Sequence, residues 1–485
     1  MSDHGSLNHI YRTVWNEALG AMVAVAEITT GGSRSSGASS RSRTRLGSHP
    51  LAANTLAALS LAIAIGWGAM LPGAIANPAG GVAIHGQVST STPAPNQLKV
   101  VTQNGVGTSH SAINWQSFSI PAGSTTSFVQ PSATSTAINR VVTNTPSALF
   151  GSLSSNGRLV LVNQSGIAVG AGAVIDTAGF TASALRMSDA DALAGRLRFG
   201  EANAVMGSGA GITVRGRITA RDGDVVLIAP NIDVGTSALV QAPNGSTVLA
   251  AGQQVEITGR GLEGITLLVQ APADRVRNLG RLEGDAAGIF AGTLRHSGEI
   301  QATAASVEGG KVVLKALDLL ELGGRTTAKG LGGMGGVVLA TGREVQVLAG
   351  AVVDASAPAG GGEVLIGGGA HGKDGRISNA QSTSVAGGAT IRADATSQGA
   401  GGTAVVWSDN NTQFSGAISA QGGPLGGNGG WVETSGASLK IADSARVSTA
   451  AAMGLAGTWL LDPPDFTIAA SGGDITGATL STNLG

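Results

Sequence analysis

A glycine-led block repeats at a fixed interval in the second half of this 485-residue sequence. Gly310, Gly336 and Gly362 each precede a short Val/Leu run, and they are 26 residues apart. Further copies start at Gly402 and Gly430, which are 40 and 28 residues further on. A repeat of this length is typical of a solenoid, in which each unit contacts only its neighbours. The sequence therefore predicts one stacked array.

The composition favours short β-strands joined by turns. Glycine accounts for 77 residues, 42% of the chain is hydrophobic and only 12% is charged, which is the reverse of a disordered chain. Glycine does not recur at every third position, which excludes collagen. Runs such as Asp224–Ile228, Ser246–Ala250 and Val255–Thr258 are strand-like and bounded by turn residues. We expect an all-β parallel β-helix with two or three strands in each coil.

The fourth copy of the repeat is delayed by 14 residues. The extra length matches the polar stretch from His371 to Thr383. An insertion that leaves the repeat otherwise intact predicts an extra loop leaving one side of the solenoid.

The N-terminal region has the three parts of a secretory signal. Basic residues precede an apolar run from Leu51 to Leu71, and the small residues Ala74 and Ala76 follow a Pro-Gly break. We expect cleavage between Ala76 and Asn77. About 20 apolar residues are also enough for an uncleaved membrane anchor, which is the competing interpretation.

The segment before this signal, from Asn8 to Glu27, resembles the extended signal-peptide region of large exported proteins of Gram-negative bacteria. The resemblance implies export through the general inner-membrane secretion machinery. Removal of residues 1–76 leaves 24 basic and 27 acidic residues, so the remaining chain carries no nucleic-acid-binding charge. The chain contains no cysteine, which suits passage through the periplasm in an unfolded state.

A set of ordered motifs resembles the secretion domain of the filamentous haemagglutinin family and the high-molecular-weight adhesins. They are Asn114–Ile120, Phe128–Pro131, Ala137–Val141, Leu149–Gly151, Asn156–Ile167, Gly179–Leu185 and Ser188–Asp191. The resemblance implies a right-handed parallel β-helix with an N-terminal cap and small extra-helical hairpins. It also implies an outer-membrane β-barrel partner transporter.

The resemblance divides the chain into three parts. Residues 1–76 are the extended signal peptide, 77–310 the two-partner secretion domain, and 311–485 further β-helix repeats. Motifs in the last part, at Val406–Asp409, Gly429–Gly436 and Gly457–Pro463, recur in large haemagglutinin-like exoproteins, where much more sequence follows. We therefore expect a fragment or a truncated reading frame.

The resemblance also names candidate residues for secretion. They are Asn139, Arg140, Asn163, Gln164, Ser165, Gly166 and Ile167. The family has Asn-Pro-Asn-Gly where this chain has Asn163-Gln164-Ser165-Gly166, so the rigid proline is missing. Two interpretations remain open, a structural β-turn and a direct contact with the transporter.

Catalytic and metal-binding patterns are absent from the sequence. Asp189/Asp191 and Asp222/Asp224 are close acid pairs, and a turn or helix-cap role fits both. His85, His110, His296 and His371 lack metal-ligand spacing. We predict no cofactor, no metal and no enzyme. The expected function is that of an adhesin with host-cell or matrix receptors; the alternatives are the stalk of a contact-dependent toxin and a polysaccharide-active β-helix.

Overall fold

The structure is a computed structural model that describes residues 11–16, 21–26, 76–200, 210–304 and 309–484. The chain divides into two compact units, Met1–Leu71 and Pro72–Gly485. In the first unit, β1 (Tyr11–Asn16) pairs antiparallel with β2 (Ala21–Ala26).

The predicted signal lies mostly outside the described residues. This holds for the apolar run from Leu51 to Leu71 and for Ala74. Ala76 and Asn77, on either side of the predicted cleavage site, are the first described residues of the second unit. Among the residues that the structure describes, no helix is both long and apolar enough to cross a membrane.

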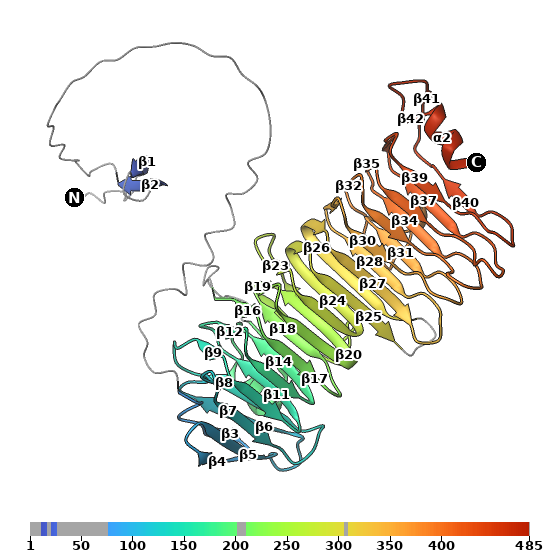
Figure 1. Ribbon diagram of the computed structural model, residues 1–485. Coiled ribbons are helices and arrows are strands. Elements are labelled where there is room, and N and C mark those ends of the chain that lie inside the picture. Colours follow the sequence, from blue (N-terminus) through green and yellow to red (C-terminus); the bar gives the residue numbers. More distant parts are fainter. Residues whose placement is uncertain (1–10, 17–20, 27–75, 201–209, 305–308, 485) are drawn as a thin grey trace, which may run out of the picture. The chain divides into compact units, whose positions relative to one another are not determined.

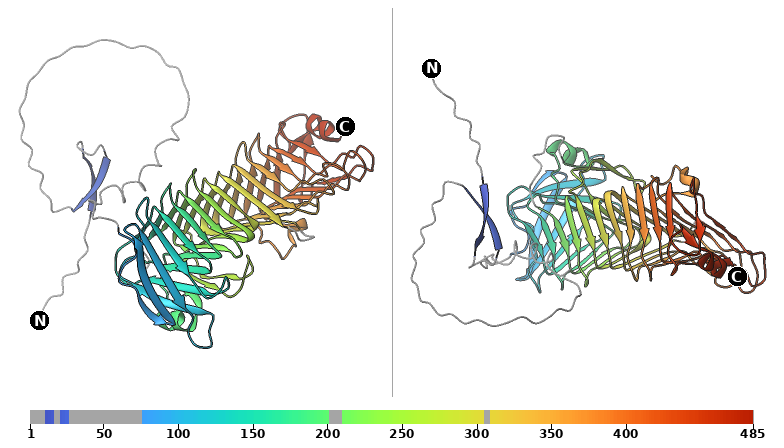
Figure 2. Two further views of the ribbon diagram at one scale, coloured as in Figure 1. Left: turned by 60° about the horizontal axis from the view of Figure 1, so that its bottom comes forward. Right: turned by 90° about the horizontal axis from the view of Figure 1, so that it is seen from above.

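The second unit is a parallel β-helix, in which most strands pair in parallel with their equivalents in the coils before and after (Figure 1). Each coil passes through three sheet faces, which we name A, B and C, in the order B, A, C. Figure 2 shows the successive coils stacked one on the next. The predicted all-β parallel β-helix is confirmed, and its coils have three faces.

The strands of each face are short. Face A contains β6 (His110–Trp115), β8 (Thr136–Val141), β11 (Arg158–Val162), β14 (Gly179–Ser183), β18 (Val225–Ala229), β28 (Val337–Thr341), β31 (Glu363–Ile366), β34 (Thr403–Trp407), β37 (Trp431–Ser435) and β40 (Thr458–Leu460). Face B contains β5 (Gln97–Gln103), β7 (Thr125–Val129), β10 (Ser152–Ser155), β13 (Val174–Thr177), β17 (Arg217–Ala220), β25 (Glu299–Ala304), β27 (Arg325–Gly330), β30 (Val352–Asp354), β33 (Thr390–Arg392), β36 (Ala417–Ser419) and β39 (Arg446–Ser448). Face C contains β9 (Ser147–Leu149), β12 (Ile167–Val169), β16 (Ile212–Val214), β19 (Asn231–Val234), β23 (Arg275–Asn278), β29 (Glu344–Val347), β32 (Ser382–Val385), β35 (Asn411–Phe414) and β38 (Ser438–Ile441). Three longer strands continue around corners: β20 (Leu239–Ala251) from face B to face A, β24 (Arg281–His296) through faces B, A and C, and β26 (Lys311–Leu322) from face A to face C.

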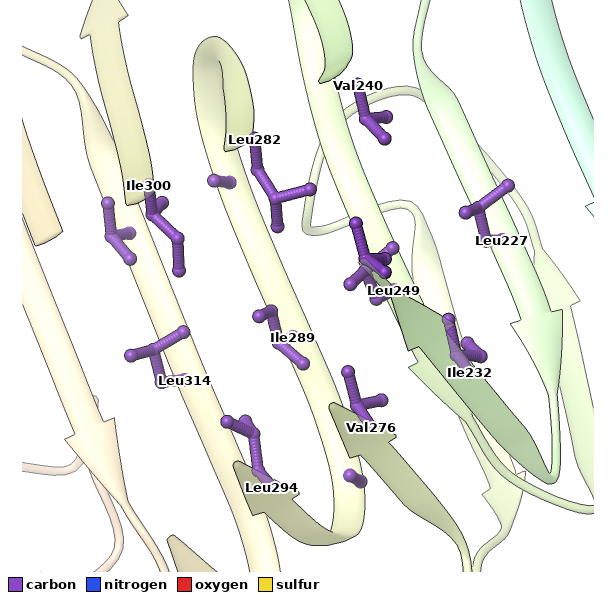
Figure 3. Close-up of a cluster of buried hydrophobic side chains, with 14 of the residues drawn as sticks. Leu227, Ile232, Val240, Leu249, Val276, Leu282, Ile289, Leu294, Ile300 and Leu314 are labelled. Carbon is purple, nitrogen blue, oxygen red and sulfur yellow. The ribbon is translucent and has the colours of Figure 1, made fainter. Parts of the chain in front are cut away.

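Inward-pointing side chains from the three faces form one continuous apolar core. Leu227, Leu249, Ile289 and Leu314 follow one another in register on face A, and all four are fully buried (Figure 3). Burial of each such side chain stabilises the fold by roughly 1.5–3 kcal/mol. A single coil contributes only one side chain to each column, so the core forms only when coils stack.

The repeated glycines are explained by the close approach of neighbouring coils at the corner where face B meets face A. A Cβ atom at Gly336 would lie 2.2 Å from the carbonyl oxygen of Gly310, and one at Gly362 would lie 2.1 Å from that of Gly336. The same carbonyls accept the first hydrogen bond of the next coil, from Val337 and Glu363, both at 2.9 Å. Any side chain here would therefore separate the coils.

Three insertions leave the β-helix at the corner between face A and face C. The first contains α1 (Asp189–Ala194) and β15 (Leu197–Phe199), and the second contains β21 (Gln254–Ile257) and β22 (Ile265–Val269). The third, residues 367–381, includes the 3-10 helix η1 (Ala370–Gly372) and matches the position predicted from the delayed repeat.

These insertions fold back over an apolar outer side of face A. The outward side chains of Val160, Val226 and Val248 pack with Phe199 and Val255 from the first two insertions. Further along, Leu339, Leu365 and Val405 pack with Ile377 of the third. β15, β21 and β22 form a small antiparallel sheet.

Antiparallel strands precede the first parallel coil and form the N-terminal cap that the resemblance implied. β3 (Val82–His85) pairs with β6, and β4 (Gln87–Ala94) pairs with β5. At the other end lie β41 (Ile468–Ala469), β42 (Ile475–Thr476) and α2 (Gly477–Leu484). There the side-chain oxygen of Asn483 accepts a hydrogen bond from the backbone of Val447 at 2.6 Å.

Candidate functional site

The segment Asn163–Ile167 forms the corner that leads from β11 on face A to β12 on face C. The backbone N–H of Gly166 donates to the carbonyl of Asn163 at 3.0 Å, which closes a tight turn. Gly166 has a φ of +100°, a left-handed conformation that residues with a Cβ rarely adopt. Ile167 then enters the core and is fully buried.

The side chain of Asn163 is fully buried and holds this turn in place. Its Oδ1 accepts a hydrogen bond from the backbone N–H of Ser165 at 2.9 Å. Its Nδ2 donates to the carbonyl of Thr145 and to the hydroxyl of Ser147, both at 2.9 Å. These bonds tie the turn to the preceding coil without the proline of the family pattern. Gln164, which takes the place of this proline, is exposed.

Asn139 lies inside the β-helix, in the inward column between Ile113 and Leu161. Its Oδ1 accepts a hydrogen bond from the indole N–H of Trp115 at 3.0 Å, and its Nδ2 donates to the carbonyl of Ala137 at 3.0 Å. A buried amide and a buried indole therefore satisfy one another in the core.

Arg140 points outward from the same strand and is almost covered, with 9% of its side chain exposed. Its Nη2 donates to the carboxylate of Asp189 in α1, which is itself 75% exposed. Its Nη1 is buried and has no hydrogen-bond partner among the described residues. Asn114 is its neighbour on β6, and the side-chain oxygen of Asn114 is also buried without a described partner.

The structure brings Arg140 and the turn together in consecutive coils. Arg140 pairs with Val162, directly before Asn163, and the backbone N–H of Asn163 donates to the carbonyl of Ser183 at 2.9 Å. The first insertion starts after Ser183. We call Arg140, the turn Asn163–Gly166, Ser183 and Asp189 the corner site.

The sequence did not reveal the roles of Ser183 and Asp189 in the corner site, or that Ser147 binds the side chain of Asn163. Ser147 lies one coil before Ile167, with which it pairs. That relation could have been found only from the register of the coils, and the early coils have no constant length.

One member of each acid pair has a structural role. Asp224 accepts hydrogen bonds from the backbone N–H groups of Ser246 at 2.8 Å and Gly261 at 3.1 Å. Ser188 caps α1, accepting from the backbone of Asp191 at 3.0 Å and donating to its carboxylate at 2.6 Å. These roles fit the turn and helix-cap interpretation.

The histidines and acids form no metal-binding group within the described part of the chain. The rings of His85 and His110 stack with centroids 4.3 Å apart, and burial lowers the pKa of His110. His371 lies in the third insertion, where its backbone N–H donates to the carboxylate of Glu433 at 3.0 Å. Burial raises the pKa of Glu433.

The fold and the corner site define a capped parallel β-helix with insertions over one face. Residues 80–330, more than half of the chain, match the family model described as the TPS secretion domain. Residues 8–58 match the model described as the Extended Signal Peptide of Type V secretion system. The chain therefore belongs to the TPS (two-partner secretion) family and is a secreted exoprotein.

A solved relative supports this assignment. The crystal structure of the HMW1 secretion domain from Haemophilus influenzae is 32% identical and superposes with a TM-score of 0.70. The match covers 80% of this chain and all of that domain.

Two curated relatives are each named heme/hemopexin-binding protein. The one from Haemophilus influenzae strain ATCC 51907 is 28% identical over 281 residues, which is 52% of this chain and 28% of that protein. The other, also from Haemophilus influenzae, is 35% identical over 77 residues, which is 16% of this chain and 8% of that protein. The matches thus span less than a third of either relative.

Proposed function

We propose that this chain is exported through a dedicated outer-membrane β-barrel transporter and acts at the cell surface as an adhesin-type exoprotein. The secretion-domain match over residues 80–330 carries the proposal. The general inner-membrane machinery would recognise the extended signal and release the chain into the periplasm after Ala76. The transporter would then recognise residues 77–310.

In this proposal, residues 77–310 also act as the folding nucleus. Each finished coil presents a row of unpaired backbone groups on which the strands of the next coil pair. Pairing at the outer surface would hold the emerged chain there and bias export outward without ATP. Residues 311–485 would extend the same β-helix.

The corner site would serve export by completing the early coils. The three side-chain hydrogen bonds of Asn163 join consecutive coils, which supports a folding role for that residue. Gln164 is the exposed residue of the turn and is the one placed to touch a transporter directly. Separate substitutions of these two residues can distinguish the two roles.

An adhesive role fits the outer sides of faces B and C, which no insertion covers among the described residues. Arg281, Glu299 and Arg277 lie there, within ion pairs that run across coils. Broad polar faces of this kind suit shallow contact with host-cell or matrix receptors.

Export can be tested in a Gram-negative host that lacks the transporter. We expect the chain to reach the medium only when a two-partner outer-membrane transporter from the same genome is co-expressed. The matched control is a transporter without its periplasmic domains, which should leave the chain in the periplasm. Equal secretion with and without the transporter would refute the proposal. Adhesion is then measured by binding of the producing cells to epithelial monolayers.

A further inference from the structure

The last coil of the β-helix has strand edges that face no further coil. β38 and β39 pair with β35 and β36 on one side, and no strand among the described residues pairs with their other side. In earlier coils the same side binds the strands of the next coil. Unpaired edges readily add strands from other molecules, so natural sheets cover them.

Residues 462–484, which we call the end cap, supply partners for both edges. The cap contains β41, β42 and α2, and Figure 1 shows these elements at the end of the stack. The backbone N–H of Ile441, the last residue of β38, donates to the carbonyl of Asp474 at 2.8 Å. The backbone N–H of Val447 in β39 donates to Asn483 Oδ1 at 2.6 Å.

These contacts take the place of a further coil. Neighbouring residues in a parallel strand bond alternately to the strands on its two sides. Arg446 N–H bonds back to the carbonyl of Gly416 in the preceding coil at 3.0 Å, so the N–H of Val447 points to the far side. Ile418 holds the position of Val447 one coil earlier and pairs with it in register. For the last coil, the amide oxygen of Asn483 replaces a backbone carbonyl.

Apolar side chains of the end cap close the core. Ile475 is fully buried within the continuous core of the β-helix, and Phe466 and Leu480 pack against the same core. Without them the inward side chains of the last coil, such as Leu439, would face water. The cap therefore covers the end of the core as well as two strand edges.

Polar contacts fix the end cap on the rim of the last coil. Lys440 of β38 forms an ion pair with Asp474 at 2.6 Å. The carboxylate of Asp443, between β38 and β39, accepts hydrogen bonds from the hydroxyls of Thr476 at 2.8 Å and Thr479 at 2.7 Å. These contacts join the cap to both strands, so its position is specific.

The outer side of α2 offers no edge for a further strand. A helix bonds its backbone groups internally, and its exposed residues here are Ala478, Ser481 and Thr482, which are small or polar. A polar outer surface is what an array of stacked coils needs at its end to stay in solution. The end cap has this surface on one side and the apolar closure on the other.

We propose that the end cap blocks strand addition to faces B and C of the last coil and so prevents end-to-end association of the chain with a second copy. A second copy is the partner that fits an uncapped end, because it presents the same two strand edges around the same core cross-section. The inference depends on neither the transporter nor the adhesive role.

Sedimentation velocity tests the proposal by comparing the full chain with a variant that stops at Leu461. From about 1 to 100 μM the full chain should stay monomeric and the shortened chain should associate more as its concentration rises. In dilute shortened chain, hydrogen exchange at Ile441 and Val447 should be roughly tenfold faster or more, because both amides lose their acceptors.

A substitution in the full chain tests the same contact without shortening it. Asn483→Ala should speed hydrogen exchange at Val447 by roughly threefold or more, because it removes the acceptor alone. Ser481→Ala is the matched control, since Ser481 lies on the exposed side of the same helix, and exchange should not change. If circular dichroism shows that the shortened chain has lost its β-structure, this comparison decides the proposal.

Charges on the open edges distinguish strand addition from aggregation of the uncovered core. Ser438→Lys with Ser448→Lys, at outward positions of β38 and β39, should return the shortened chain to a monomer, because like charges would face one another across the new contact. Three results would overturn the proposal: a shortened, folded chain that stays monomeric; association that the two lysines do not reduce; or exchange at Val447 that Asn483→Ala leaves unchanged.

Discussion

Asn163 illustrates how a single buried amide can hold a turn that contains no proline. A proline restricts φ and so lowers the entropy of the unfolded turn, whereas Asn163 stabilises the folded turn through hydrogen bonds. The turn therefore depends on Thr145 and Ser147 of the preceding coil being in place.

Asn163→Ala should destabilise the secretion domain by about 1–3 kcal/mol, because it leaves buried partners without hydrogen bonds. Secretion should fall with stability. Denaturant unfolding of the chain and its amount in the medium measure the two effects. Gln164→Ala is the control, with a stability change within about 0.5 kcal/mol. Normal stability and secretion of Asn163→Ala would contradict the folding role, whereas a secretion defect in Gln164→Ala alone would show direct contact.

A second buried polar pair lies in the interior column of face C. Asn278 and His296 pair in register, and both are fully buried. The backbone N–H of Gly280 donates to Asn278 Oδ1 at 3.1 Å, so the amide nitrogen faces His296 Nδ1, also at 3.1 Å. The ring proton therefore lies on Nε2, which faces the carbonyl of Arg325 at 3.4 Å.

Burial lowers the pKa of His296 to about 4 from its ordinary 6.5. The unfolded chain therefore binds a proton between these values while the folded chain does not, so stability falls as pH drops from 6.5 towards 4. The loss should reach about 3 kcal/mol. Unfolding midpoints at pH 7.5 and pH 4.5 measure it, and His296→Gln should reduce the difference. If the unaltered chain and His296→Gln lost the same stability between pH 7.5 and pH 4.5, His296 would not be the cause of the loss.

At the scale of elements, a coil can carry a long insertion at the corner that leads from face A to face C. The third insertion, residues 367–381, is held by Ile377 in an apolar cluster and by Arg376, which forms ion pairs with Glu363 at 2.7 Å and Asp374 at 2.6 Å. It leaves the pairing of β29 with β32 intact. The insertion therefore covers face A without interrupting the ladder.

Replacement of residues 367–381 by a three-residue connection like Thr341-Gly342-Arg343 should preserve the β-helix and expose Leu339, Leu365 and Val405. Circular dichroism should keep its β signal, and binding of a hydrophobic dye should rise. Arg376→Ala is the control, because Ile377 would still cover the cluster. Loss of β-structure in the shortened chain would show that the insertion is needed for folding.

At the scale of the whole molecule, stability should be shared mainly between neighbouring coils. The core is continuous along the β-helix. Within it, each inward side chain lies next to the side chains at the same position in the preceding and following coils. A local defect should therefore weaken adjacent coils first.

Leu314→Ala should cost about 2–5 kcal/mol by leaving a cavity in the core. Hydrogen exchange should become faster in β24, β26 and β28 and stay nearly unchanged in β6 and β8. Lys315→Ala, at the exposed neighbouring position, is the control. Uniformly faster exchange along the chain would instead indicate a single cooperative unit.

The sequence alone determined the class of fold, because the 26-residue spacing of Gly310, Gly336 and Gly362 reflects the length of one coil. It also located the third insertion. It could not provide the register of the early coils, where Leu159 precedes its partner Phe180 by 21 residues but Phe180 precedes its partner Val225 by 45.

Only the tertiary structure decided which side chains meet between coils. Asn163 and Ser147, or Asn278 and His296, become neighbours through pairing across coils, and no local sequence pattern encodes that pairing when insertions change the coil length. The repeated glycines likewise combine a feature of the sequence with a cause that only the structure shows. Their spacing is visible in the sequence, but the reason for them, a carbonyl oxygen about 2 Å from where a Cβ would lie, exists only between stacked coils.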